Sequence, residues 1–405
     1  MRLKTDLLGR IRNNNSLQYV KDIKLIDVAG GIDKSRTVNL SEIADSIEYI
    51  PLETSREAII GKIFYDMIFF ENGLLYISLQ NESMKIFNDR GKYINTINKK
   101  GRGPGEYEQF RYIDINYVTG NIYIEGYEKI IEYNKNGDYI RTINFPKKSE
   151  KDNLRLYFFR NFNNYNLMAS NVNQDSKYSA VILDSTSKII KKIKYPIEER
   201  EYIKSMARPY GSTNPRIFKY GNKIRLINGH NKYILGINED LSVDTAFVIN
   251  YGEYDTKLKS MTQLKPNSPY LWHKFNVYES DDYLFTMFHV GSLLKNPTFL
   301  INPNGKQYNY YYACSFYKKE TGEFSFIDQP KINQLGFIDD FEGGPAVWPK
   351  YISYDNYMIS IIAAYDFKAF ADNNKVSRKY HELADNLKDS DNYILVKVKL
   401  KKTLE

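Results

Sequence analysis

Short runs in which apolar and polar residues alternate recur along the whole chain. A period of two is typical of half-buried β-strands and not of helices. Two groups of such runs are especially alike: LLYISLQNESMKIFNDRGKYINTI, from Leu74, and NIYIEGYEKIIEYNKNGDYIRTI, from Asn121. In each, an Asn-x-x-Gly turn separates two runs, and the last run ends in Thr-Ile. Asparagine and glycine tolerate the positive φ of tight hairpin turns, so each group predicts an antiparallel meander.

The meander repeats along the chain. Gly91 and Gly137 occupy the same turn position in the first two units. Weaker copies follow: NLMASNVNQDSKYSAVILDSTSKIIKKI with Ser187 at the glycine position, KIRLINGHNKYILGINEDLSV, DYLFTMF with PTFLINPNGK, and YMISIIAAY with YILVKVKL. A single blade cannot bury both of its faces, so such units stack around an axis. The sequence therefore predicts an all-β fold, a six-bladed β-propeller of four-stranded antiparallel blades.

Two features concern the ends of this ring. The run SIEYIPLE (Ser46–Glu53) precedes the first full unit, and we expect it to pair with the C-terminal strands and close the propeller. In the last unit, NKVSRKYHELADNLKDSD has apolar residues at helical spacing, which predicts a short helical insertion. The predicted domains are a leader at 1–37 and a propeller at 38–405.

Composition narrows the class of protein. Of 405 residues, 42% are hydrophobic and 26% charged, as in ordinary globular proteins, and no apolar run is long enough to span a membrane. Cys314 is the single cysteine, so no intramolecular disulfide can form, and four histidines disfavour a multi-histidine metal site. The net charge of +8 is spread evenly, and its densest cluster is KKIK at 191–194. We therefore expect a monomer that binds no nucleic acid.

The order of the motifs LSEIADSIEYIPLET, IGKI, GKYINTI, GRGPGEY and NYILVKVKL resembles a family of bacterial six-bladed β-propellers related to NHL-repeat propellers. The resemblance extends over residues 38–400, and IEYIPLET together with GRGPGEY carries most of it. Such proteins are common in glycan-foraging Gram-negative bacteria and usually carry an export or lipoprotein signal. The resemblance implies a periplasmic or outer-surface location, although neither that signal nor a lipobox cysteine is found in this sequence. It implies no catalytic residues.

The glycine-rich stretch GRGPGEYEQFR, from Gly101, looks at first like a phosphate-binding loop. It lacks the Gly-Lys-Ser/Thr ending, and a strand-like run follows it where a helix would be needed. We interpret it as the connection from the outer strand of one blade to the inner strand of the next. A valine at Gly103 is expected to be destabilising if that φ is positive. The stretch would carry four candidate ligand-binding residues to the channel mouth: Arg102, Glu106, Tyr107 and Arg111. The alternative is an Arg–Glu clamp that only fixes the loop.

Three further candidates are Trp272, His273 and Trp348, which precede the inner strands of later units and are flanked by proline and glycine, as loops are. Aromatic rings at a channel mouth can stack on a sugar or a peptide ring, or they can fill the gap between blades. No cofactor is expected, apart from calcium at the acidic turn FIDDFEGG. Its carboxylates, Asp339, Asp340 and Glu342, match no calcium-loop template, which favours a solvated turn.

Two functions remain open. The first is an exported or cell-surface binding or scaffold protein that recognises a glycan or a protein partner at the channel face. The alternative is a metal-dependent lactonase- or lyase-like enzyme with one axial metal, for which Asp66, Asp114 and His273 could converge. The sequence shows no paired nucleophile and base of the kind that covalent hydrolysis needs.

Overall fold

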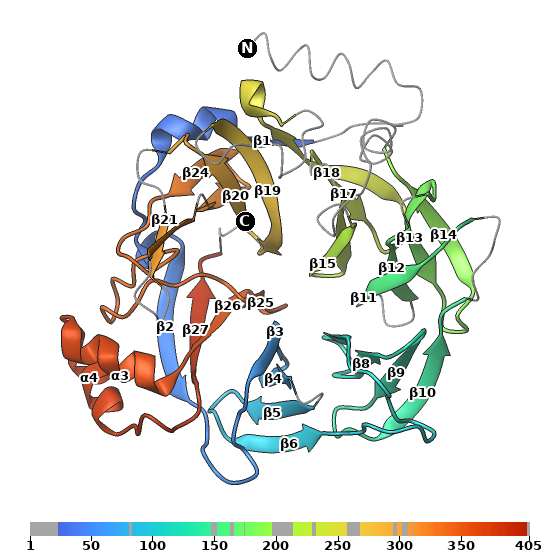
Figure 1. The fold of residues 1–405 in the computed structure, drawn as a ribbon, viewed down its shortest axis with the longest axis horizontal. Coiled ribbons are helices and arrows are strands. Elements are labelled where there is room, and N and C mark those ends of the chain that lie inside the picture. The colour runs from blue at the N-terminus through green and yellow to red at the C-terminus, as the bar shows by residue number, and fades with distance from the viewer. Residues whose placement is uncertain are drawn as a thin grey trace.

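The computed structural model describes residues 23–80, 83–146, 152–162, 166–173, 175–196, 214–228, 232–256, 268–294, 298–301, 307–310 and 312–402. They form a six-bladed β-propeller, as predicted (Figure 1). The first two blades consist of β3 (Ile63–Glu71), β4 (Leu74–Leu79), β5 (Met84–Asn88) and β6 (Tyr93–Ile97), then β7 (Tyr112–Ile115), β8 (Ile122–Glu125), β9 (Lys129–Tyr133) and β10 (Tyr139–Asn144).

The next two blades are a four-stranded and a five-stranded sheet. The third consists of β11 (Leu156–Phe162), β12 (Asn166–Asn171), β13 (Tyr178–Leu183) and β14 (Ile189–Lys194). The fourth consists of β15 (Arg216–Tyr220), β16 (Lys223–Ile227), β17 (Tyr233–Ile237) and β18 (Val243–Asn250), with β1 (Lys24–Asp27) as a fifth strand beside β18. In every blade the first strand lies nearest the axis (Figure 1).

The last two blades carry insertions. The fifth consists of β19 (Pro269–Glu279), β20 (Tyr283–Gly291), β23 (Tyr312–Lys318) and β24 (Glu323–Ile327). The sixth consists of β25 (Tyr351–Ile352), β26 (Tyr357–Ile362), β27 (Ile394–Leu400) and β2 (Ala44–Pro51). Short 3₁₀ helices lie at η1 (Ala29–Lys34), η2 (Leu40–Glu42) and η4 (Gly252–Tyr254).

The ring closes in the sixth blade. β2 pairs antiparallel with β27 over seven residue pairs, from Ala44 opposite Leu400 to Pro51 opposite Ile394. This is the closure that the alternating pattern of residues 46–53 predicts. It gives the outer edge of the last blade a partner from the start of the chain, so the ring leaves no open seam there.

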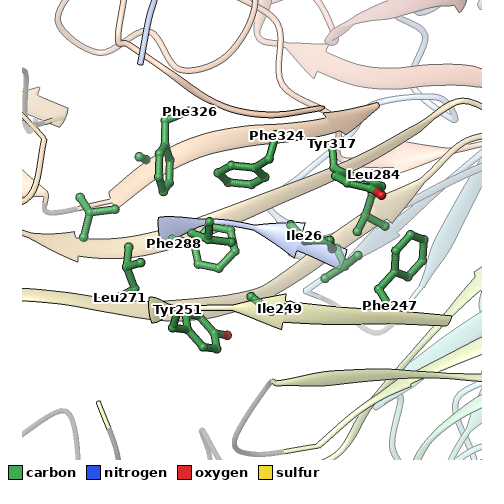
Figure 2. Packing of buried hydrophobic residues seen from close by; sticks show 14 of the residues in the cluster. Ile26, Phe247, Ile249, Tyr251, Leu271, Leu284, Phe288, Tyr317, Phe324 and Phe326 are labelled. Carbon is green, nitrogen blue, oxygen red and sulfur yellow. The ribbon is translucent and has the colours of Figure 1, made fainter. Parts of the chain in front are cut away.

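The N-terminal segment contributes to the propeller earlier than the predicted boundary at residue 38. β1 adds to the edge of the fourth blade as a parallel partner of β18, with Ile26 opposite Ile249. Ile26 is buried in the cluster between the fourth and fifth blades, together with Phe247, Phe288 and Phe326 (Figure 2). Residues 24–27 of the predicted leader therefore belong to a blade, and residues 1–22 lie outside the described residues.

The prediction of a helical insertion is confirmed, and one strand prediction needs correction. The insertion contains α4 (Arg378–Asp385), which the apolar spacing indicates, preceded by a second helix, α3 (Ala364–Asn373). The rings of Phe367 in α3 and Tyr380 in α4 stack 3.9 Å apart. The run PTFLI is not a blade strand. It forms β21 (Thr298–Ile301), which pairs only with β22 (Gln307–Tyr310) among the described strands, and the predicted Asn304-Gly305 turn lies outside the described residues.

The turn chemistry of the repeat is as predicted. Gly91 has φ of +76° and Gly137 has φ of +87°, and Ser187 takes the same place in the third blade at +71°. The preceding Asn88 side chain accepts hydrogen bonds from the backbone N–H groups of residues 90 and 92. These asparagine-led turns fix the register between the third and fourth strands of a blade.

Candidate functional site

A cavity of about 420 Å³ lies where the inner strands end, on the face of the propeller formed by the turns between first and second strands. The fourth, fifth and sixth blades and the first two all contribute to its wall. Its principal lining residues are Glu71 at the end of β3, Tyr117 after β7, Lys219 and Tyr220 at the end of β15, and Tyr351 and Tyr354 in and after β25.

Two tyrosines form an aromatic wall of this cavity. The rings of Tyr117 and Tyr354 stack with centroids 4.3 Å apart and planes within 10°. They come from the turns of the second and sixth blades, so they bridge across the first. Tyr354 is 50% exposed, which leaves one face of the pair open to solvent. An open aromatic face is suited to the apolar face of a sugar ring.

Glu71 supplies a buried carboxyl group beside these rings. The Tyr351 hydroxyl donates to its Oε1 at 2.6 Å, and the Tyr354 backbone N–H lies within 3.3 Å of both oxygens. Burial raises the pKa of Glu71 to about 7, and the hydrogen bonds from Tyr351 and Tyr354 only partly oppose it. Near neutral pH this group can therefore accept or donate a hydrogen bond towards the cavity.

Lys219 crosses the channel beneath the cavity. Its Nζ lies 2.6 Å from Oδ2 of Asp114 on the second blade and 2.9 Å from the Ile115 carbonyl oxygen. The same Asp114 oxygen accepts the Asn161 backbone N–H at 2.7 Å. Burial lowers the pKa of Lys219, and Asp114 opposes that shift. This contact joins the second and fourth blades past the third, so it fixes the floor of the cavity.

A second ion-pair cluster supports the wall at the fifth blade. Glu279 accepts two hydrogen bonds from Arg225, at 2.8 and 2.9 Å, and its Oε1 lies 2.8 Å from Nζ of Lys319. Burial alone would raise the pKa of Glu279, but Lys319 and Arg225 together hold it below its ordinary value. Lys319 also lies over the Tyr220 ring, 3.8 Å from its centroid. The cluster therefore positions one of the cavity tyrosines.

The predicted glycine-rich loop lies at the opposite end of the inner strands, because it enters β7 at its first residue. Tyr107 is fully buried there, and its hydroxyl accepts the Lys99 backbone N–H at 3.1 Å. Glu106 accepts the Gly103 backbone N–H at 2.7 Å, which ties the loop to itself. Arg102 pairs with Glu108 at 3.5 Å and is exposed. These three residues are thus engaged in holding the loop and do not reach the cavity.

The predicted positive φ belongs to Gly105, at +73°, and not to Gly103. A Cβ atom at Gly105 would meet the Tyr139 ring at 2.7 Å. We expect Gly105→Ala to lower the free energy of unfolding by roughly 1–3 kcal/mol, measured by denaturant unfolding. Gly61→Ala is the control, since Gly61 faces open space. Equal unfolding midpoints for the two variants would show that the loop tolerates a side chain at Gly105.

The other predicted site residues are packed inside the protein. Trp272 and His273 lie within β19 and not in a loop before it, and both are buried. The His273 ring packs 5.1 Å from Phe288, and burial lowers its pKa to about 3. Trp348 stacks on Phe337 with centroids 6.1 Å apart. This packing matches the alternative in which the aromatic residues fill the space between blades.

The acidic turn holds its carboxylates apart. Asp339 accepts hydrogen bonds from the Tyr49 hydroxyl and from three backbone N–H groups, Asp340 accepts two from Ser41, and Glu342 bonds to Ser377. Within the described ranges, no group of three or more histidine, cysteine, aspartate or glutamate side chains is placed to hold a metal ion. Asp114 is engaged with Lys219, and the side chain of Asp66 lies outside the described residues.

The cavity residues were not predicted from the sequence, although a signal for them exists. Glu71, Tyr117, Lys219 and Tyr354 all lie in or beside the first turn of a unit, within FFENG, NYVTG, KYGN and YISYDN. Aligning these turns across the repeats would have brought them together. The glycine-rich connection, which is more conspicuous in the sequence, lies at the other end of the inner strands.

Comparison with known proteins identifies the family. The sequence profile of DUF4934, described as a domain of unknown function, matches residues 23–399. This chain belongs to the DUF4934 family. No curated protein shows significant sequence similarity to it. None of the described helices is long and apolar enough to cross a membrane.

Several solved structures are similar to this DUF4934 chain, and one of them, from Bacteroides fragilis, shares its fold. A Bacteroides fragilis protein predicted to be exported is 18% identical, with a TM-score of 0.65 over 93% of this chain and 100% of that chain. A DUF4221 member from Bacteroides vulgatus is 12% identical, with a TM-score of 0.45 over 89% and 98%. A virginiamycin B lyase from Staphylococcus aureus is 13% identical, with a TM-score of 0.39 over 72% and 77%. At these identities the likeness concerns the fold alone.

Proposed function

We propose that this DUF4934 protein is a binding protein of the periplasm or outer cell surface that takes a sugar ring of a glycan into the cavity. The observation that carries the proposal is the cavity wall of four tyrosines interspersed with polar groups. Stacked Tyr117 and Tyr354 would contact the apolar face of the ring, while Glu71 and the Tyr351 hydroxyl would bond to its hydroxyl groups. The fold shared with an exported Bacteroides protein supports the location.

A glycan array followed by calorimetric titration of the best-bound oligosaccharide tests this proposal. We expect Tyr354→Ala to weaken binding on the order of tenfold, because it removes the exposed ring of the stack. Tyr365→Ala is the matched control, since Tyr365 is similarly exposed but lies on α3 at the outside of the propeller. An array without ligands, or equal affinity of both variants, would overturn the proposal and turn attention to a protein partner.

A second candidate function is catalysis, which the chemistry of Glu71 favours. A carboxyl group whose pKa is about 7 can both give and take a proton at neutral pH, as a general acid or base must. Glu71→Gln should then retain ligand binding and lose turnover of the bound glycan. If the enzyme depends on an axial metal, a stoichiometric amount of metal should survive dialysis. Elemental analysis of the purified protein tests this.

A further inference from the structure

Four arginines gather at the end of the channel where the inner strands begin, opposite the cavity. They precede or lie in the inner strands of three consecutive blades: Arg111 before β7, Arg155 before β11, Arg160 within β11 and Arg216 at the start of β15. The side chains are half-buried, except Arg155, which is exposed. Nε of Arg216 is itself buried, so an external ligand would first meet Arg155 and Arg111 at the rim. We call this set the arginine cluster.

Aromatic rings separate these cations from one another. The Arg111 guanidinium lies 5.4 Å from the ring centroids of both Tyr127 and Tyr157, and the Arg155 guanidinium lies 5.4 Å from Tyr157. A hydrogen bond from Arg155, together with Arg111, lowers the pKa of the Tyr157 hydroxyl. Tyr127 is 55% exposed, so the rim of the cluster presents an open aromatic face next to two guanidinium groups.

Arg160 and Arg216, the deeper residues of the cluster, also pack against aromatic rings. The Arg160 guanidinium lies 4.7 Å from the Tyr112 ring centroid and donates to the Tyr112 hydroxyl at 2.9 Å. The Arg216 guanidinium lies 4.5 Å from the ring centroid of Phe158. Burial, followed by the like charge of Arg160, lowers the pKa of Arg216. Two cations are therefore held close enough to repel each other.

The backbone at the centre of the cluster is strained. Phe158 has φ of +50° in the middle of β11, at a break in register between Tyr157 and Phe159. A positive φ at a bulky aromatic residue costs about 1–3 kcal/mol, and such residues concentrate at binding sites. The Phe158 N–H bonds to the carboxylate of Glu125, which helps to hold this conformation. The bulge turns the Phe158 ring towards Arg216.

Charge is not balanced within the cluster. Elsewhere in the described chain, arginines lie next to carboxylates, as in the pairs Arg36–Glu42, Arg141–Glu132, Arg225–Glu279 and Arg378–Glu382. Among the described residues, Arg111, Arg155 and Arg160 have no carboxylate within 4.0 Å. Two acidic groups are buried against the cluster. Asp114 attracts Arg160 but is already paired with Lys219, and burial raises the pKa of Glu125 to about 7 against the attraction of Arg111 and Arg160. Positive charge therefore remains for an external anion.

We propose that the arginine cluster is a second binding site, for an oxyanion carried on a sugar-sized ring. Guanidinium groups bind carboxylate and sulfate oxygens through paired hydrogen bonds, and Tyr127 and Tyr157 provide flat surfaces for the ring that bears the anion. The ligand class is thus an acidic sugar, either carboxylated or sulfated. The rim of this site lies at the far end of the inner strands from the cavity, while Arg160 within β11 is in electrostatic reach of Asp114 and Tyr351. The proposal does not depend on the function proposed for the cavity.

Calorimetric titration of the full chain with glucuronate, glucose 6-sulfate and uncharged glucose tests the proposal. We expect the two anionic sugars to bind more tightly than glucose, which offers the cluster no anion, with affinity falling as salt is raised because the groups at the rim are screened. The double variant Arg111→Gln/Arg155→Gln should bind at least about tenfold more weakly. Relative affinities of the two acids distinguish the carboxylate from the sulfate form of the ligand.

Two controls keep the test decisive. Arg378→Gln removes one positive charge, where the double variant removes two, from α4 at the outside of the propeller, and should change the affinity less than about twofold. Tyr354→Ala alters the cavity and should leave binding of the acidic sugar unchanged. If the double variant unfolds, Arg111→Lys/Arg155→Lys replaces it, since lysine keeps the charge but loses the paired geometry. Equal binding of glucose and glucose 6-sulfate, or full affinity in the glutamine variant, would overturn the proposal.

Discussion

Replacing Glu279 with glutamine should lower the free energy of unfolding by about 3–5 kcal/mol. The carboxylate is fully buried between two cations, Arg225 and Lys319, whose side chains are only 9% and 8% exposed. Glutamine keeps the shape of the side chain but removes its charge. Two positive groups would then remain in a poorly solvated place with no carboxylate between them, and the fourth and fifth blades would lose an ion pair that joins them.

Denaturant unfolding of the purified variants measures this effect. Glu323→Gln is the control, because Glu323 is exposed on the outer strand of the same blade. Combining Glu279→Gln with Lys319→Met should recover part of the loss, since one of the two unpaired cations is then removed. A loss below about 1 kcal/mol in the single variant would mean that water reaches the cluster and screens it.

Glu71→Gln should change how stability depends on pH. Burial raises the pKa of this carboxyl from 4.5 to about 7, so the folded state holds the proton more tightly than the unfolded state. The free energy of unfolding that this raised pKa contributes is fully present below pH 4.5, the pKa of the group in the unfolded chain. It is lost as the pH rises through about 7. The loss is 1.36 kcal/mol for each unit of pKa difference, or about 3 kcal/mol for this group.

The glutamine variant cannot ionise and keeps both hydrogen bonds at that position. We expect it to match the unmodified protein near pH 4.5 and to be more stable at pH 8 by about 3 kcal/mol. The difference between the two unfolding curves is the quantity to measure, because Glu125 titrates over the same range in both proteins. Parallel curves from pH 4.5 to 8 would show that Glu71 is solvated in the folded state.

The parts of the fold that could be predicted are those that short stretches of sequence encode. Alternation and Asn-x-x-Gly turns identify a meander, and the turn at Gly91 has the backbone that the pattern requires. The closing strand β2 is also recognisable, because its alternating residues precede the first repeat unit of the sequence and belong to none of the units. PTFLI was misassigned because a strand in a separate two-stranded hairpin has the same local pattern as a strand in a blade. α3 was missed because its apolar residues directly follow those of β26.

The candidate site could not be predicted in the same way, because its residues meet only when the ring is complete. Lys219 and Asp114 are 105 residues apart in the sequence and belong to blades that are not neighbours in the chain. Tyr117 and Tyr354 are separated still further. The cavity lies at one end of the inner strands because side chains from five blades meet there. No single unit of the sequence shows which end that is. The glycine-rich loop, by contrast, is conspicuous in the sequence for reasons of backbone geometry alone.

The pairing of β2 with β27 determines when the protein can finish folding. Ala44 must wait for Leu400 to leave the ribosome, so β2 has no partner strand while the blades between them are made. Until then the sixth blade lacks two of its four strands, and the nascent chain has no complete native state. A fragment that stops before β27 would leave β2 without its partner strand and β26 with one unpaired edge, so the ring could not close.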